Sequence, residues 1–217
     1  MRSFSDLTSL KGRVALVAGG ASPQGRAIAT TYAELGAAVA LLDQPGSEAE
    51  SIAGALTEKY GVLVTAITAE TGDLASIRKV PQRVVDSCGR LDILVNIGLS
   101  ENVPLDQLNP ETWQNAMTTG LTAPFLLIQQ AIPALQTSGR GSIINLSTAT
   151  GIAACATGGG LAQLSRSLAE VLGPAVRVNA VAGGTADDLR GAAAFLASDL
   201  GAHVTGQCLN FGGFGTI

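Results

Sequence analysis

Short runs of apolar, mostly β-branched residues alternate along the chain with longer segments in which apolar residues recur at helical spacing. The runs are apolar throughout instead of alternating with polar residues, which is typical of parallel strands covered by helices on both faces. The pattern predicts seven strands, over residues 13–18, 38–43, 62–67, 92–96, 142–147, 176–181 and 203–211. It therefore favours an α/β protein with a parallel sheet.

The segments between these runs predict the connecting helices. Apolar residues recur at helical spacing over approximately residues 24–35, 48–60, 73–88, 110–135 and 159–172. Gly36 supplies a stop for the first helix, and Asn109 followed by Pro110 is a capping signal for the fourth. Because crossovers between parallel strands are right-handed, we expect a doubly wound, Rossmann-type sheet in the order 3-2-1-4-5-6-7. Without a repeat or linker, residues 1–217 are expected to form a single domain.

Composition narrows the classes of partner. The 217 residues are 47% apolar and only 14% charged, with a net charge of −4 and no run of Lys or Arg. This balance argues against nucleic acid and anionic membrane partners, and no apolar run reaches membrane-spanning length. Three widely spaced cysteines, without metal-ligand spacing, indicate reduced thiols, and the N-terminal segment lacks the apolar region of a signal peptide. We expect a cytoplasmic protein without a bound metal.

A glycine-rich turn, VAGGASPQGRAIA (17–29), joins the first predicted strand to the first helix. A helix N-terminus offers unpaired N–H groups and the positive end of the helix dipole to a pyrophosphate. Such a turn alone is a weak signal, but its position after the first strand strengthens it. Gly19, Ser22, Gln24 and Gly25 are the predicted cofactor contacts in this turn.

Asp43 ends the second predicted strand, where dinucleotide-binding folds place a carboxylate that accepts the adenosine ribose hydroxyls. A carboxylate there would also repel a 2′-phosphate, so the sequence favours NAD over NADP. The alternative is that Asp43 only caps the next helix or turn.

Several further stretches accompany the glycine turn in a fixed order: DILVN (92–96), NPETWQNAMTTGLTAPF (109–125), GSIINLST (141–148), LSRSLAEVLGPAVRVNAVAGG (164–184) and FLASDLGAHVTGQCLNFGG (195–213). In these stretches the chain resembles the short-chain dehydrogenase/reductase family over nearly its whole length. The resemblance implies an NAD(P)-dependent oxidoreductase acting on a small alcohol or carbonyl substrate. It also implies a homodimer or homotetramer.

The chain departs from the family pattern at cofactor positions. Ala18 replaces the threonine that leads the glycine turn, and Pro23 replaces its middle glycine, which is expected to weaken cofactor binding because proline lacks an N–H and brings a ring toward the phosphate. After the fourth strand, Asn96 matches the family, and Gly98 is a second predicted cofactor contact. An equal alternative for Asn96 is that its amide ties neighbouring strand ends together.

The departures are larger at the family's catalytic positions. In the resemblance, Gly120 stands where the family has the asparagine that holds a water of the proton relay. Thr148 stands where the family has the catalytic serine, and it alone keeps a hydroxyl. Alignment back from LSRSLAE puts Ala154 and Gly158 at the tyrosine and lysine of the Tyr-x-x-x-Lys pair. Carbonyl reduction needs a proton for the developing alkoxide, and an unassisted hydroxyl is too weak an acid to supply it.

Other assignments of the acid are no better. An ungapped alignment from Thr148 puts Leu161 and Ser165 at the pair instead. Tyr32 and Tyr60 belong to early helices expected to point away from the cofactor, and His203 is expected in a surface loop before the last strand. Cys155, the remaining candidate nucleophile, has no base nearby in sequence and is expected to be a small buried residue.

Two segments are shorter than the family pattern: the one between Thr148 and Ala154, and the one after residues 180–184, where the family carries a helical lid. Three hypotheses follow. The chain is an oxidoreductase by descent with weak or absent turnover, a non-catalytic NAD-binding or assembly module, or a repurposed enzyme without hydride transfer. The resemblance supports the first and the missing residues favour the second.

Overall fold

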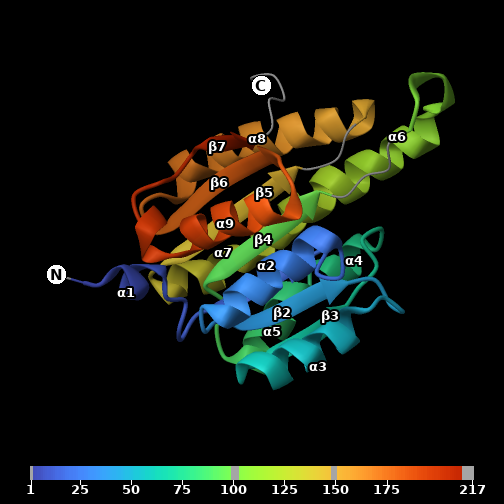
Figure 1. Ribbon diagram of the computed structural model, residues 1–217. Helices are drawn as coiled ribbons and strands as arrows, with labels where there is room; N and C mark the ends of the chain where they lie inside the picture. Colours follow the sequence, from blue (N-terminus) through green and yellow to red (C-terminus); the bar gives the residue numbers. More distant parts are fainter. Residues whose placement is uncertain (1, 99–102, 148–150, 212–217) are drawn as a thin grey trace.

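The computed structural model describes residues 2–98, 103–147 and 151–211. Within these residues seven parallel strands form one sheet in the order β3-β2-β1-β4-β5-β6-β7 (Figure 1). The strands are β1 Val14–Ala18, β2 Ala38–Asp43, β3 Val64–Thr68, β4 Ile93–Gly98, β5 Gly141–Ser147, β6 Val176–Gly183 and β7 Cys208–Phe211. The predicted doubly wound sheet and its strand order are confirmed.

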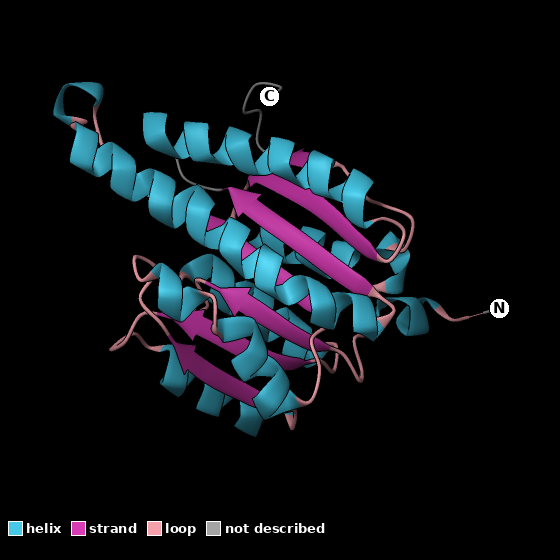
Figure 2. Ribbon diagram, turned by 180° about the vertical axis from the view of Figure 1, so that it is seen from behind, coloured by secondary structure: helices cyan, strands magenta, loops and turns pink. Residues whose placement is uncertain are grey.

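Helices cover both faces of the sheet, which explains why the strands are apolar throughout. One face carries α2 (Pro23–Glu34), α3 (Ala49–Tyr60) and α9 (Ala186–Ala197). The other carries α4 (Leu74–Ile77), α5 (Val80–Cys88), α7 (Ala123–Ser138) and α8 (Ile152–Leu172). Helix α6 (Pro110–Met117) continues into α7 through a π-helical turn, Thr118–Thr122, and α6 packs against α8 (Figure 2). The short helix α1 (Phe4–Thr8) precedes β1.

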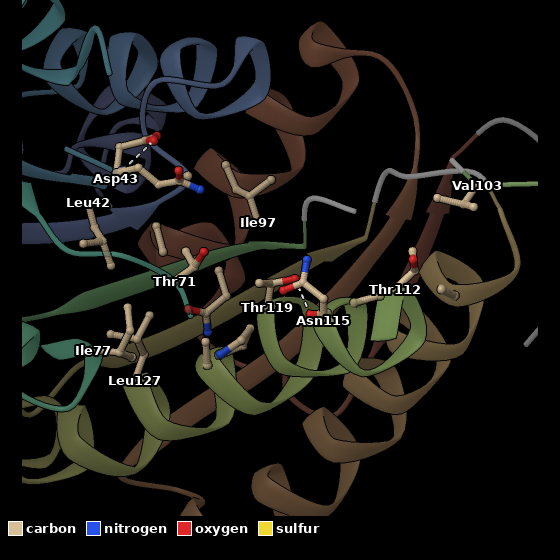
Figure 3. A pocket seen from close by; sticks show the side chains of 18 of the residues that line it. Leu42, Asp43, Thr71, Ile77, Ile97, Val103, Thr112, Asn115, Thr119 and Leu127 are labelled. Carbon is tan, nitrogen blue, oxygen red and sulfur yellow. Dashed lines mark hydrogen bonds between the residues drawn. The ribbon is translucent and has the colours of Figure 1, made fainter. Parts of the chain in front are cut away.

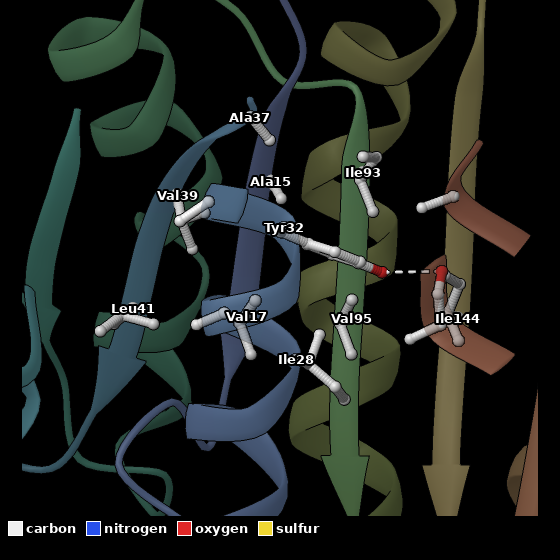
Figure 4. Packing of buried hydrophobic residues seen from close by; sticks show 14 of the residues in the cluster. Ala15, Val17, Ile28, Tyr32, Ala37, Val39, Leu41, Ile93, Val95 and Ile144 are labelled. Atoms are coloured by element: carbon white, nitrogen blue, oxygen red, sulfur yellow. Dashed lines mark hydrogen bonds between the residues drawn. The ribbon is translucent and has the colours of Figure 1, made fainter. Parts of the chain in front are cut away.

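Tyr32 is the largest fully buried side chain of the face formed by α2, α3 and α9. It packs over β1 and β4, and its hydroxyl donates to the Ala193 carbonyl oxygen at 3.1 Å, which joins α2 to α9 (Figure 4). Burial raises the pKa of the Tyr32 hydroxyl well above its ordinary value. This tyrosine is therefore a structural residue, as its place on an early helix predicted.

Ionic contacts gather at the amino ends of the strands. The fully buried carboxylate of Asp92 accepts two hydrogen bonds from Arg90, one from Arg140 and one from the Val14 N–H. These bonds join the starts of β1, β4 and β5, and a buried carboxylate requires this degree of pairing. The charges that hold the sheet together here lie at the edge opposite the glycine turn.

Some predicted elements differ from the structure. The helix expected over residues 159–172 begins earlier, at Ile152, and forms α8. The helix expected over residues 73–88 is split into α4 and α5, because Pro81 has no N–H with which to continue the hydrogen bonding of α4. The last strand is limited to β7, since Gly206 has φ +72° and interrupts an extended chain over residues 203–207. None of the described helices is long and apolar enough to cross a membrane.

Candidate functional site

A cavity of about 260 Å³ lies at the carboxyl ends of β1, β2 and β4 (Figure 3). The chain leaves β1 toward β2 on one side, whereas β4 lies on the other, so this is the switch point of the sheet, where doubly wound folds bind ligands. The lining includes Ala18, Gly19, Leu42, Asp43, Gln44, Thr71, Ile77, Asn96, Ile97, Val103, Leu108, Thr112, Asn115, Ala116, Thr119, Ala123, Pro124, Leu127 and Ala153.

The glycines of the turn allow α2 to approach the sheet closely. A Cβ at Gly25 would overlap the Gly19 carbonyl oxygen and lie 2.8 Å from the Gly20 Cα, and a Cβ at Gly20 would lie 2.9 Å from the Leu41 Cβ. Ser22 is the N-cap of α2: its hydroxyl accepts from the Gly25 N–H at 3.0 Å and donates to the Gly19 carbonyl oxygen. Ser22 therefore stabilises the turn through these two hydrogen bonds.

Most N–H groups of this turn already have acceptors. Gly19 and Gly20 donate to the Leu42 carbonyl oxygen, Ala21 donates to Asp43, and Ser22 donates back to Gly19. Pro23 occupies the first position of α2, where its missing N–H removes no helical hydrogen bond. Among the described residues, the Gln24 N–H is the one N–H of residues 19–25 with no protein acceptor, so a single backbone donor of this turn remains for a phosphate.

Asp43 both supports the turn and lines the cavity. Its two carboxylate oxygens accept from the Ala21 and Gln44 N–H groups, each at 2.8 Å. This capping of the turn is the contact that the alternative reading of Asp43 requires. It does not exclude the ribose reading, because each carboxylate oxygen keeps a further lone pair and the half-buried side chain lines the cavity.

Asn96 belongs to a buried chain of side-chain hydrogen bonds. Its Nδ2 donates to Asn145 Oδ1 at 2.8 Å, Asn145 Nδ2 donates to Ser165 Oγ at 2.9 Å, and Ser165 Oγ donates to the Leu161 carbonyl oxygen at 2.7 Å. The Asn96 amide thus joins β4 to β5, as predicted by the alternative in which it ties neighbouring strand ends together. Asn96 Oδ1 is buried without a partner among the described residues. Gly98 is also buried, where β4 and β5 approach closely.

The positions that the resemblance assigns to the proton relay lie together around α8. Gly120 lies in the π-helical turn, and a Cβ there would be 3.0 Å from three atoms of the Thr157 side chain. The Thr157 hydroxyl donates to the carbonyl oxygen of the buried Ala154 at 3.0 Å. A Cβ at Gly158 would overlap the Ser147 hydroxyl oxygen and lie 2.9 Å from the Ser147 Cβ. Thr148 lies outside the described residues.

The alternative alignment assigns residues that lie deeper in the protein. Ser165 bonds to Asn145, two residues before the end of β5, whereas Gly158 packs against Ser147, the last residue of that strand. Leu161 is fully enclosed. Geometry therefore favours Ala154 and Gly158 as the α8 residues at the carboxyl edge.

The other candidate acids and nucleophiles do not line the cavity. His203 is exposed in the turn before β7, as expected, and Tyr60 ends α3 with Lys59 over its ring. The expectation that Cys155 is buried is wrong. Ala153, Ala154, Thr157 and Gly158 form the buried side of α8, so helical periodicity turns Cys155 to the solvent.

The connection between β6 and α9 contains only Gly184 and Thr185. Thr185 caps α9 through a reciprocal bond pair with Asp188. The helix thus begins immediately after the strand, and the described chain has no segment at this point that forms a lid. The structure therefore has a short connection after residues 180–184, and its shortening relative to the family stays a prediction.

Sequence reasoning missed five polar residues of the lining: Gln44 after β2, Thr71 after β3, and Thr112, Asn115 and Thr119 on α6 and the π-helical turn. Asn115 and Thr119 are separated by one helical turn, a spacing that places both on one face. That spacing was the available signal, but only the packing of this helix against the sheet shows which face meets the cavity.

A glycine turn, a carboxylate after β2 and a cavity at the strand switch point define the class of α/β proteins that bind nucleotides at this edge. A profile of the family described as short chain dehydrogenase matches residues 13–192. The chain belongs to this family, whose members typically bind a nicotinamide cofactor.

Individual relatives agree with this assignment. D-threitol dehydrogenase of Mycolicibacterium smegmatis is 31% identical over 246 residues, covering 96% of this chain and 94% of that protein. A dehydrogenase/reductase of Sinorhizobium meliloti has 29% identity and a TM-score of 0.88, covering 97% and 98%. NADPH-dependent 3-quinuclidinone reductase of Rhodotorula rubra shares the fold, with 23% identity, a TM-score of 0.88 and coverage of 97% and 94%. The 246-residue match exceeds the 217 residues of this chain, so the first relative has residues without a counterpart here.

We predict that Gly158→Ala destabilises the protein, although alanine is normally the better helix former. The added methyl group overlaps Ser147, and overpacking of this kind costs about 1–3 kcal/mol of the free energy of unfolding. Gly54→Ala in the exposed part of α3 is the matched control, because a Cβ there has nothing within 4 Å. It should stabilise by about 0.5–1 kcal/mol.

Chemical denaturation measures both effects. The double variant Ser147→Gly with Gly158→Ala should recover part of the loss by removing the obstructing side chain. If Gly158→Ala stabilised the protein as much as Gly54→Ala, α8 would not approach β5 as closely as described.

Proposed function

We propose that this family member binds NAD and has weak or absent turnover of alcohols and carbonyl compounds. The observation that carries the proposal is the contact of Gly158 with Ser147, which leaves no room for a lysine side chain beside the end of β5. With Ala154 and Gly120 also lacking functional groups, no proton donor of the family pattern stands at these positions. The family membership supports the binding, and the missing groups support the loss of turnover.

The described residues fit the adenosine half of a dinucleotide. Asp43 would accept the ribose hydroxyls, Gln24 would donate its N–H to a phosphate, and the lining near Ile77 and Leu127 offers an apolar surface for a base. Gly19, Gly25 and Gly98 would act through the close backbone approach that they permit. When bound, the nicotinamide supplies or accepts a hydride. Asp43 supports NAD over NADP because its charge opposes a 2′-phosphate.

Without the family's proton donors, the chain would contribute to the reaction mainly by positioning the substrate and the cofactor. Thr148 is the one relay position with a hydroxyl, and a hydroxyl without a neighbouring cation is a poor acid near neutral pH. The short connection from β6 to α9 supplies no cover to exclude water from a substrate. A repurposed enzyme finds no support, since the described residues include no group of three His, Cys, Asp or Glu able to hold a metal.

A role as an assembly module finds support on the outer helices. Exposed large apolar side chains on α6, α7 and α8 include Trp113, Phe125, Ile152 and Val171. If these side chains join into one contiguous patch, that patch marks an interaction surface, so we include a homodimer or homotetramer in the proposal. The apolar C-terminal sequence FGGFGTI is a further candidate contact, and it lies outside the described residues after Phe211. Three free cysteines support a cytoplasmic location.

We predict that the protein binds NAD at least about tenfold more tightly than NADP, equivalent to about 1.4 kcal/mol. Asp43→Asn should abolish most of this ratio, because it removes the charge that opposes the 2′-phosphate. Asp73→Asn is the control, since Asp73 is an exposed cap of α4 and changes the net charge equally. Calorimetric titration gives both dissociation constants, and equal values in the wild type would contradict the role of Asp43.

We predict turnover at least about 10²-fold below the typical enzyme median of about 10 s⁻¹, because general acid catalysis contributes about 10²–10⁴-fold. NADH oxidation over a panel of carbonyl compounds and NAD reduction over a panel of alcohols measure it. A residual rate belongs to this chain if Asp43→Asn lowers it, and to a contaminant otherwise. Turnover near the median on any substrate would show that another group supplies the proton.

We predict a solution mass of two or four times 21.8 kDa, measured by light scattering at micromolar concentration. Phe125→Glu should shift the protein toward the monomer, because it places a charge on the outer face of α7. Leu63→Glu, an exposed leucine outside these helices, is the control and should leave the mass unchanged. A monomeric wild type would refute the assembly.

A further inference from the structure

One long stretch of the chain forms most of the cavity wall and contains almost no positive charge. Between Arg90 and Arg166 the sequence has a single basic residue, Arg140. This stretch includes β4, α6, the π-helical turn, α7, β5 and the first half of α8, and most of the described lining comes from it. Arg140 lies at the amino ends of the strands, where it donates to Asp92, so the stretch brings no cation to the described lining.

We propose that one part of the cavity accepts uncharged groups and excludes carboxylates and phosphates. This part, the α6 side, is the lining that comes from residues 103–119 and from Ala153, and its apolar surface is supplied by Val103, Leu108, Ala116 and Ala153. The proposal assigns a chemical class to the ligand: a neutral, mainly apolar molecule, as opposed to a hydroxy acid, a keto acid or a sugar phosphate. It rests on the proposed function because it concerns a ligand of the same cavity, but it follows from residues other than the cofactor contacts.

The α6 side is also poor in hydrogen-bond donors. The Thr119 hydroxyl donates to the Asn115 carbonyl oxygen at 3.0 Å, and the Thr112 hydroxyl donates to Asn109 Oδ1 at 3.1 Å (Figure 3). Each hydroxyl has one hydrogen, so neither threonine keeps one for an anion. Of the polar side chains on the α6 side, the exposed amide of Asn115 remains as a donor. A carboxylate bound here would receive few hydrogen bonds in exchange for those that it makes with water.

The charged side chains around the α6 side are negative. Asp43 is the one charged residue of the described lining. The short helix η1 (Leu105–Gln107) carries Asp106, and α6 carries Glu111, without a basic residue in either element. A negatively charged ligand therefore meets repulsion at this wall in place of a counter-ion.

One effect favours an anion. Helix α8 begins at Ile152, next to Ala153 of the lining, and the positive end of a helix dipole attracts negative charge. Such a dipole changes the affinity for a charged group about two- to fivefold. Burial of a carboxylate without a counter-ion lowers the affinity by about 10²-fold or more, because the ion loses its hydration. The loss of hydration outweighs the dipole, so the net effect is exclusion.

The test compares cyclohexanecarboxamide with cyclohexanecarboxylate, which have nearly the same shape and differ by one negative charge at neutral pH. Dissociation constants come from NMR titration of the wild-type protein without a cofactor. We expect the amide to bind at least about tenfold more tightly, equivalent to about 1.4 kcal/mol. Equal or tighter binding of the carboxylate, or no binding of the amide up to its solubility, would overturn the proposal.

Asn115→Lys tests whether this wall is responsible. Asn115 is exposed on α6 and belongs to the lining, so a lysine there supplies the missing cation without entering the core. It should raise the affinity for the carboxylate about two- to fivefold, the range of a partly exposed ion pair, and leave the affinity for the amide unchanged. Gln114→Lys is the matched control, because it adds the same charge to the neighbouring exposed residue of α6 outside the described lining.

Equal effects of the two lysine variants would show that the charge of the whole protein excludes the carboxylate, which would refute the role of the α6 side. NAD titration keeps this result separate from the proposed function. Failure of NAD to bind, with the preference for the amide intact, would refute the proposed function alone. Binding of NAD together with equal affinities for the amide and the carboxylate would refute the exclusion of anions alone.

Discussion

The close approach of two helices to the carboxyl ends of the strands is the contact on which the site depends. Helix α2 packs so tightly that a Cβ at Gly25 has no space against the Gly19 carbonyl, and α8 does the same at Gly158 against Ser147. Close packing of this kind leaves no freedom for a side chain at either position. It sets the hydrogen bonding of the glycine turn and determines which groups reach the cavity.

The charged groups that stabilise the sheet and the groups that line the cavity lie at opposite ends of the strands. At the amino edge, the buried carboxylate of Asp92 engages Arg90 and Arg140, and Arg13 bonds to Asp199, so charges hold the strand starts together. At the carboxyl edge, Asp43 is the one charged residue of the described lining. The sheet is secured away from the cavity, which allows the cavity wall to change in chemistry without loss of the fold.

In the proposed function, the fold keeps a nucleotide-binding edge, and α8 lacks the side chains of the family's proton relay. The π-helical turn persists around Gly120, where the contact with Thr157 fills the space that a longer side chain would need. Among the described residues, only Gly184 and Thr185 separate β6 from α9, so no lid forms within this connection.

The sequence by itself determined the strands, their order, the position of the glycine turn and the cap at Asn109, because each follows from periodicity or from residues adjacent in the chain. It also identified Asn96, with both of its readings. Only the tertiary structure decided that Asn96 bonds to Asn145 and leaves one oxygen unpaired, and that Gly158 meets Ser147. These contacts join residues far apart in the chain, and their geometry depends on how closely each helix packs on the sheet, which no local pattern encodes.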